Sequence, residues 1–189
     1  MRIIVGVSGA SGVIYAVRLL EVLRELGVET HLVMTGWARR TLEQELGRSP
    51  GEVMALASRT YSIADLSAPI ASGSFRTAGM VVVPCSMKSL AAIASGLSGD
   101  LLSRAADVCL KERRTLVLCP RETPLNAIHL ENMLRLSRAG AIIMPPVPAF
   151  YHRPRTLDEV VDHFVGRILD HFGLEHGLYR EWQGIEGEE

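Results

Sequence analysis

Short apolar runs alternate with segments of helical spacing along the 189 residues of this chain. Runs rich in Val, Ile and Leu predict buried strands, and apolar residues that recur every three or four positions predict amphipathic helices between them. The predicted strands cover 2–7, 29–34, 79–84, 115–119 and 140–144. The predicted helices cover 12–26, 36–47, 50–58, 87–95, 99–112, 125–138 and 157–172. This alternation with short connections predicts an α/β fold, a parallel sheet flanked by helices on both faces.

The length of the chain suits one domain with a substantial core, and we find no repeat and no linker. We expect this domain to span residues 1–174 and residues 175–189 to form an exposed C-terminal tail. Residues 59–78 form the longest irregular stretch. Within it, Ser67–Ser74 is too small and polar for a core, which favours a binding or interface loop.

The composition narrows the class of protein. Hydrophobic residues make up 48% and charged residues 22%, which is typical of soluble globular proteins. The net charge of −1 gives no overall field that would attract nucleic acid or an anionic membrane. Three cysteines form no Cys-x-x-Cys pair, and the N-terminus does not resemble a signal peptide. We therefore expect a cytoplasmic protein that binds neither nucleic acid nor membrane.

The predicted strand at 115–119 ends in a stiff loop with two charged side chains. Pro120 and Pro124 fix the backbone, so Arg121 and Glu122 are presented side by side at the carboxyl end of a strand. An arginine there suits a phosphate, and the glutamate could move protons or hold the arginine in place. The alternative is a surface ion pair in a tight turn.

Two further strand ends carry small and polar residues. The turn Gly6–Gly12 brings backbone N–H groups to a helix N-terminus, which suits an anion; the alternative is a tight turn in which Ser11 caps the helix. In Pro84–Ser89, two serine hydroxyls and the helix amides form a phosphate cradle, while Cys85 is a buried hydrophobe rather than a nucleophile. The hydroxyl of Thr35, after the second strand, could likewise cap the helix that follows.

These motifs, with Ala105–Arg114, Ile128–Met133 and Phe150–His152, occur in an order that resembles the UbiX-type flavin prenyltransferases. The resemblance covers about residues 3 to 172 and implies a Rossmann-like, flavodoxin-like fold. It also implies that the chain binds flavin mononucleotide (FMN). The flavin-binding residues that it implies are Gly9, Ala10, Ser11, Thr35, Ser86, Met87, Lys88, Ser89 and Arg121. The family usually has small residues where Met87 and Lys88 stand.

The resemblance also implies a reaction. A dimethylallyl group passes from dimethylallyl phosphate to N5 and C6 of reduced FMN, without a metal, and the prenylated FMN serves UbiD-type decarboxylases. Catalytic roles are implied for Glu122, Glu45 and Ser11, and donor phosphate contacts for Lys111, Arg121, Tyr151 and Arg167. The family forms dodecamers, with active sites where subunits meet. Without the resemblance, Glu45 and Lys111 would be taken for solvated helix charges.

The sequence departs from the family at one aromatic position and leaves two other functions open. Leu66 stands near the expected tryptophan, which Trp182 could replace. The first alternative is a flavin-dependent cysteine decarboxylase of the same fold, but no histidine lies between His31 and His129, and the loop Ile70–Ser74 differs from the decarboxylase loop. The second is a flavin carrier without chemistry. The six histidines form no metal-binding motif.

Overall fold

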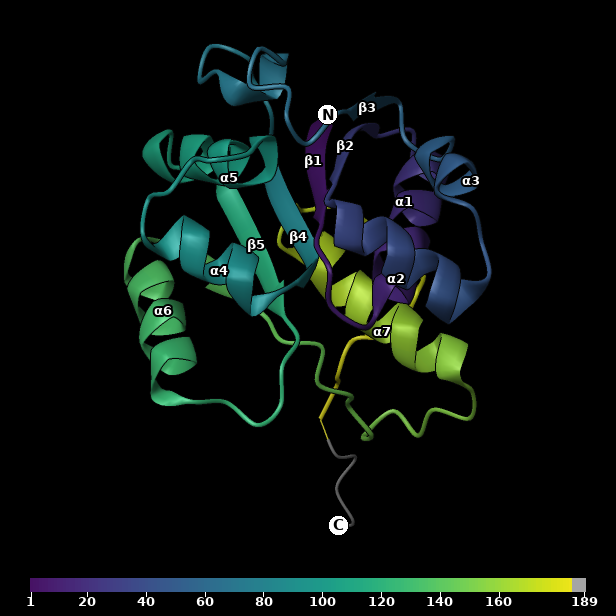
Figure 1. Ribbon diagram of the computed structural model, residues 1–189. Coiled ribbons are helices and arrows are strands. Elements are labelled where there is room, and N and C mark those ends of the chain that lie inside the picture. The colour runs from purple at the N-terminus through teal and green to yellow at the C-terminus, as the bar shows by residue number, and fades with distance from the viewer. Residues whose placement is uncertain (185–189) are drawn as a thin grey trace.

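The computed structural model describes residues 1–184, and its centre is a parallel sheet with helices on both faces (Figure 1). The strands within this range are β1 (Arg2–Val7), β2 (Glu29–Met34), β3 (Arg59–Tyr61), β4 (Gly79–Cys85), β5 (Thr115–Pro120) and β6 (Ile142–Ile143). Their order in the sheet is β3-β2-β1-β4-β5-β6, and every pair is parallel. This is the order of Rossmann-type doubly wound sheets, so the predicted fold class is confirmed.

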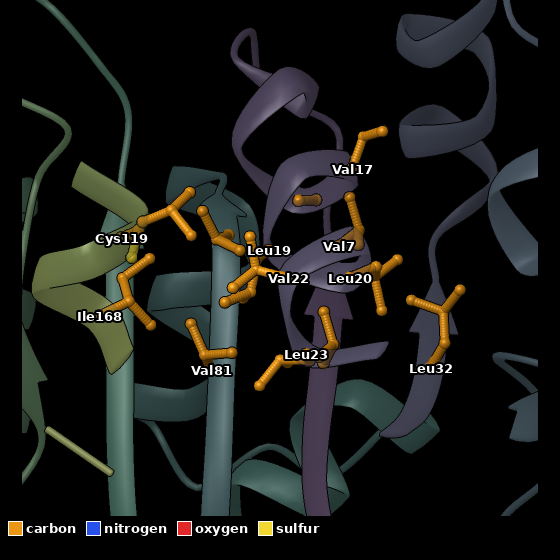
Figure 2. Close-up of a cluster of buried hydrophobic side chains, with 14 of the residues drawn as sticks. Val7, Val17, Leu19, Leu20, Val22, Leu23, Leu32, Val81, Cys119 and Ile168 are labelled. Carbon is orange, nitrogen blue, oxygen red and sulfur yellow. The ribbon is translucent and has the colours of Figure 1, made fainter. Parts of the chain in front are cut away.

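Successive side chains of each central strand enter two different cores. Ile3, Val5 and Val7 of β1 face one core, while Ile4 faces the other. The first core is covered by α1 (Val13–Glu25), α2 (Gly36–Leu46), α3 (Pro50–Met54) and α7 (Leu157–Asp170). The second is covered by α4 (Met87–Ala94), α5 (Leu101–Lys111) and α6 (Ala127–Arg138). Figure 2 shows the first core, with side chains of α1 and α7 gathered over the sheet.

The structure and the sequence prediction differ in several places. Strand β6 covers only Ile142–Ile143 of the predicted 140–144. The stretch 59–78, predicted to be irregular, contains the edge strand β3 and a 3₁₀ turn at Pro69–Ala71. Helix α3 ends at Met54 rather than at residue 58. Strand β5 continues through Pro120, which pairs with Cys85 next to a register shift in β4. An irregular strand end is a place where a missing N–H is tolerated, so this proline does not stop the strand.

The start of the predicted tail packs against the domain. Leu174 and Leu178 contact the core covered by α1 and α7, and the Tyr179 hydroxyl donates to Asp170 Oδ2 at 2.5 Å. Residues 185–189 of the predicted tail lie outside the described residues, and the boundary at residue 174 stays a prediction. Within residues 1–184, no helix has the length and apolar character needed to cross a bilayer.

Candidate active site

The chain reverses its course across the sheet at β1. It runs outward from β1 through β2 to β3, and then returns to β4 on the other side of β1. In open α/β sheets, ligands bind at the carboxyl ends of the strands at this switch point. The turns that follow β1 and β4, both predicted as binding turns, meet there.

Ser8 ties these two turns together. Its side chain is fully buried; its backbone N donates to the carbonyl of Pro84 at 3.2 Å, and its hydroxyl donates to the same oxygen at 3.0 Å. The hydroxyl also accepts from the backbone N–H of Ser86 at 2.7 Å. Ser8 had no role in the sequence prediction. The available signal was a hydroxyl directly after the buried run of β1, where a polar group needs a partner.

Hydroxyl side chains begin two of the helices around the switch point. Thr35 caps α2 by accepting from Ala38 N at 3.1 Å, which is the structural role considered for it from the sequence. Ser86 caps α4 by accepting from Ser89 N at 3.3 Å, and its hydroxyl lies 3.2 Å from that of Ser89. The N-terminal ends of α2 and α4, with their positive dipole ends, thus open toward the same edge of the sheet.

Helix α1 begins differently, and the cap considered for Ser11 is wrong. The N-cap residue is Gly12, whose φ of 99° lies in the left-handed region that favours glycine. The cap comes from α2 instead, because Glu45 Oε2 accepts from Gly12 N at 3.0 Å and from Val13 N at 3.2 Å. Glu45 therefore interacts with the positive end of the α1 dipole, and it is not merely the solvated helix charge that the sequence alone would suggest.

A cavity of about 150 Å³ lies at the carboxyl ends of the strands, next to these turns. Five predicted flavin-binding residues line it: Gly9, Thr35, Ser86, Lys88 and Ser89. Trp37, Ala92, Asp100, Leu102 and Ser103 complete the wall. Sequence reasoning missed these five, and for Trp37 the signal appears only once its contact with the turn at Gly9 is known.

The remaining predicted flavin-binding residues lie near this cavity without lining it. Ala10 and Ser11 continue the turn that follows β1. The Met87 side chain packs against the core under α4, so it contributes to the fold. Cys85 is buried in the same region, as expected for a small hydrophobe, and burial raises the pKa of its thiol to about 12, which disfavours the reactive thiolate.

Arg121 and Glu122 are both exposed after β5. The backbone N of Arg121 donates to the carbonyl of Cys85 at 3.2 Å, which fixes the loop against β4. Glu122 Oε1 accepts from the backbone N–H of Thr123 at 3.0 Å. Among the described contacts Arg121 and Glu122 form no ion pair with each other, so the alternative of a simple surface ion pair is not what the structure shows.

Tyr151 and Arg167 line a second, larger cavity of about 800 Å³. The indole of Trp182 meets the Tyr151 ring edge-on, with centroids 5.4 Å apart. Arg167 Nη1 donates to Asp170 Oδ2 at 3.0 Å and to the Tyr179 hydroxyl at 3.4 Å. The contact with Tyr179, followed by the charge of Asp170, raises the pKa of the Arg167 guanidinium, so a fixed cation faces this cavity.

Lys111 lies elsewhere in the chain. It is the last residue of α5, which leads back to the amino end of β5. Lys111 therefore lies at the amino ends of the strands, whereas the turns described above lie at the carboxyl ends. Its ammonium group pairs with Glu112 beside the loop at Gly73, and this hydrogen bond lowers the pKa of the Glu112 carboxyl. One chain therefore brings together Tyr151 and Arg167, but not Lys111.

Comparisons with known proteins show the family of the chain. The Flavoprotein family model matches residues 1–169. A probable UbiX-like flavin prenyltransferase from Streptomyces sp. (strain D7) is 59% identical over 186 residues, which cover 98% of this chain and 93% of the relative. A crystal structure of AnUbiX (PadA1) in complex with FMN and dimethylallyl pyrophosphate has a TM-score of 0.96 and 54% identity, with 98% of both chains covered. A dodecameric FMN-dependent Ubix-like decarboxylase from Escherichia coli O157:H7 has a TM-score of 0.95 and 57% identity, with 97% of this chain and all of that chain covered.

Cysteine decarboxylases, the first alternative from the sequence, are much more distant. The FMN-dependent cysteine decarboxylase SpaF has a TM-score of 0.61 and 21% identity over 76% of this chain. A likeness at that level shows the fold alone. The chain belongs to the Flavoprotein family and, within it, to the UbiX-type flavin prenyltransferases.

Proposed function

We propose that this chain joins a dimethylallyl group from dimethylallyl phosphate to N5 and C6 of reduced FMN. The observation that carries the proposal is the cavity at the switch point, where five of the predicted flavin-binding residues meet. The high identity to flavin prenyltransferases over nearly the whole chain supports the same reaction. Bound reduced flavin supplies the nucleophile, and the residues of the chain bind, orient and exchange protons.

The residues around the switch point fit FMN. Serine hydroxyls and the N-terminal amides of α4 are suited to its phosphate, and the exposed Trp37 ring offers a flat surface for its ring system. A Cβ at Gly9 would overlap with Trp37, so the backbone passes α2 as closely as it can. Because this cradle is compact and no second nucleotide motif is visible, we expect tighter binding of FMN than of the flavin dinucleotide.

The second cavity fits the phosphate of the prenyl donor. As the ester bond breaks, charge develops on the leaving phosphate, and Arg167 and the Tyr151 hydroxyl would stabilise it. The ring faces of Tyr151 and Trp182 would stabilise the allylic cation. Glu122, with Glu45, would take up the proton that leaves C6. No metal enters this scheme, since Lys111, Arg121 and Arg167 provide the positive charge.

The donor site is completed by other copies of the chain. Large apolar side chains stand exposed on and around α6 and in the segment before Tyr151: Leu125, Ile128, Leu130, Leu134, Val147 and Phe150. A surface of this kind favours protein contacts. We propose a homo-oligomer, a dodecamer like the related protein from E. coli O157:H7, in which Lys111 and Arg121 reach Tyr151 and Arg167 across subunit contacts.

The product would pass to a UbiD-type decarboxylase, and a cytoplasmic location remains part of the proposal.

The reaction is tested by incubating the protein with reduced FMN and dimethylallyl phosphate and measuring the mass of the flavin by mass spectrometry. We expect the flavin mass to rise by one C5 unit, and no carbon dioxide to form from a peptidyl or pantothenoyl cysteine substrate. Carbon dioxide release without prenylation would favour the decarboxylase instead.

A further inference from the structure

His163 of α7 lies behind Tyr151, and the six histidines had suggested no functional role from the sequence. Its Nε2 atom is 2.7 Å from the Tyr151 hydroxyl, and its side chain is 8% exposed. Four residues further along the same helix, Arg167 faces the cavity that Tyr151 also lines. Residues at this spacing lie on one stripe of a helix, so α7 presents both a support for Tyr151 and a cation.

The imidazole of His163 is held in one orientation. The ring of His152 stacks on it, with centroids 4.4 Å apart and planes 4° apart. The ring of Tyr179 contacts it as well, with ring centroids 4.8 Å apart and ring planes tilted by 51°. Tyr179 can approach α7 because residue 166 is a glycine: a Cβ there would come within 2.6 Å of the Tyr179 ring. His163 therefore points at the Tyr151 hydroxyl without freedom to rotate away.

The surroundings of His163 favour its neutral form. Burial lowers the pKa of His163, the charges of His152 and Arg167 act in the same direction, and Asp170 opposes them. Tyr151 and Tyr179 are the other titratable groups that face it. A neutral imidazole carries one N–H, which either donates to the phenol oxygen or leaves Nε2 to accept from the phenol.

The two arrangements give Tyr151 opposite properties toward an anion. If Nε2 accepted, the phenol O–H would point at His163, and the lone pairs of the phenol oxygen would face the phosphate. If Nε2–H donates, the phenol O–H stays free to donate to the phosphate. We propose that His163 is a positioning residue that donates from Nε2–H to Tyr151, and so directs the Tyr151 O–H toward the donor phosphate. The inference rests on the proposed function, because it assumes a phosphate in that cavity.

The first test is a double-mutant cycle. His163→Phe keeps the ring volume and the stacking but removes the N–H, while Tyr151→Phe removes the hydroxyl. Each should raise the KM for dimethylallyl phosphate by about 3- to 10-fold, the loss of one neutral hydrogen bond, and the double variant no further. FMN affinity should not change. The amide N–H of the glutamine in His163→Gln reaches the same place, so this variant should recover most of the loss. His171 is an exposed histidine at the C-terminal end of the same helix, and His171→Gln should have no effect.

Additive effects of His163→Phe and Tyr151→Phe would overturn the inference, as would an equal loss of FMN affinity in His163→Phe. If His163→Phe does not fold, ¹⁵N NMR of the histidine-labelled wild-type protein, with His163→Gln to identify the signal, decides the same point. A proton on Nε2 of His163 is expected, and a proton on Nδ1 alone would contradict the donation.

Binding of inorganic phosphate to the flavin-free protein separates the inference from the proposed function. If calorimetry shows the same non-additive losses for phosphate while no flavin mass change occurs, the prenyl reaction is wrong and the His163–Tyr151 coupling stands. If prenylation occurs and the two substitutions act independently on phosphate, the coupling is wrong and the reaction stands. Phosphate affinity that neither substitution changes contradicts the coupling.

Discussion

The two halves of the proposed active site are built in different ways. Around the flavin cavity, polar groups find partners within one chain: Ser8 links the turns after β1 and β4, Thr35 and Ser86 cap helices, and Glu45 caps α1. The residues predicted to bind the donor lie apart. Tyr151 and Arg167 share a cavity, but Arg121 is exposed after β5 and Lys111 lies at the amino ends of the strands.

This difference follows from where each group is attached. The carboxyl ends of β1, β2 and β4 meet at one edge because neighbouring strands are parallel, so the fold by itself assembles the flavin half. The donor half draws on the end of a helix, a loop and the segment before α7, which a single sheet does not bring together. We therefore infer that one copy of the chain is enough to form the flavin half, and that oligomerisation completes the donor half.

Glu122 gives the largest expected effect on turnover. Its carboxylate is exposed in the single chain and accepts only from Thr123 among the described contacts, so it is free to act on a ligand. Glu122→Gln should keep FMN binding and slow turnover by about 10²–10⁴-fold, the usual value of a general acid or base. Steady-state kinetics on the FMN-loaded protein measure this. Unchanged turnover would leave Glu122 only a structural role in its loop.

Arg167→Ala tests whether the cation of α7 belongs to the donor half alone. A charge-assisted contact is worth about 1.5–3 kcal/mol, so affinity for the prenyl phosphate should fall by about 10–150-fold. FMN affinity should stay the same, and inorganic phosphate should compete with the donor but not with FMN. Arg24→Ala, an exposed arginine on α1, is the matched control. Loss of the oligomer with unchanged donor affinity would make Arg167 an interface residue.

Gly9→Ala tests the close packing of the flavin half. The new Cβ would overlap with the Cβ of Trp37, and because a Cβ is fixed to its backbone, α2 must shift. Overpacking of this kind costs about 1–3 kcal/mol, and FMN affinity should fall with stability. Gly36→Ala is the control, since a Cβ there meets nothing within 4 Å. Thermal unfolding and FMN titration measure both variants; equal behaviour of the two would show that the turn is not tightly packed.

Glu45 gives the smallest expected effect and separates its two roles. Glu45→Ala should cost about 1 kcal/mol of stability, because the N–H groups of Gly12 and Val13 lose their acceptor. Glu45→Gln keeps an acceptor, so it should be milder in thermal unfolding. If Glu45 also moves a proton, Glu45→Gln slows turnover although the cap remains. Glu43→Ala, an exposed carboxylate on the same helix, should change neither property.

The sequence predicted five of the six described strands and their parallel arrangement, because the central strands are continuous apolar runs. β3 escaped prediction because Arg59–Tyr61 is three residues long and mostly exposed at the sheet edge, so no burial pattern marks it. The turns at Gly9 and Ser86 were recognisable from small residues that directly follow a strand. Their joining by Ser8 was not, because that contact spans 76 positions.

Contacts between side chains that lie far apart in the sequence were the main feature that the sequence could not predict. Glu45 meets the start of α1 across 33 positions, and Tyr151 meets His163 only because the segment between them folds back onto α7. Neither contact follows from periodicity or spacing. Trp37 was missed for a different reason: an exposed tryptophan at the start of a helix has meaning only once the neighbouring turn at Gly9 is known.

Mixed oligomers test most directly the claim that the donor half is shared between copies. Lys111→Ala and Arg167→Ala chains, each of low turnover alone, are coexpressed with different tags and purified as hybrids. If Lys111 and Arg167 of one site come from different subunits, about a quarter of the sites in a random hybrid carry both wild-type residues, and turnover returns in that proportion. If both residues of a site come from the same chain, no hybrid site is intact, and the absence of any recovery would contradict the account.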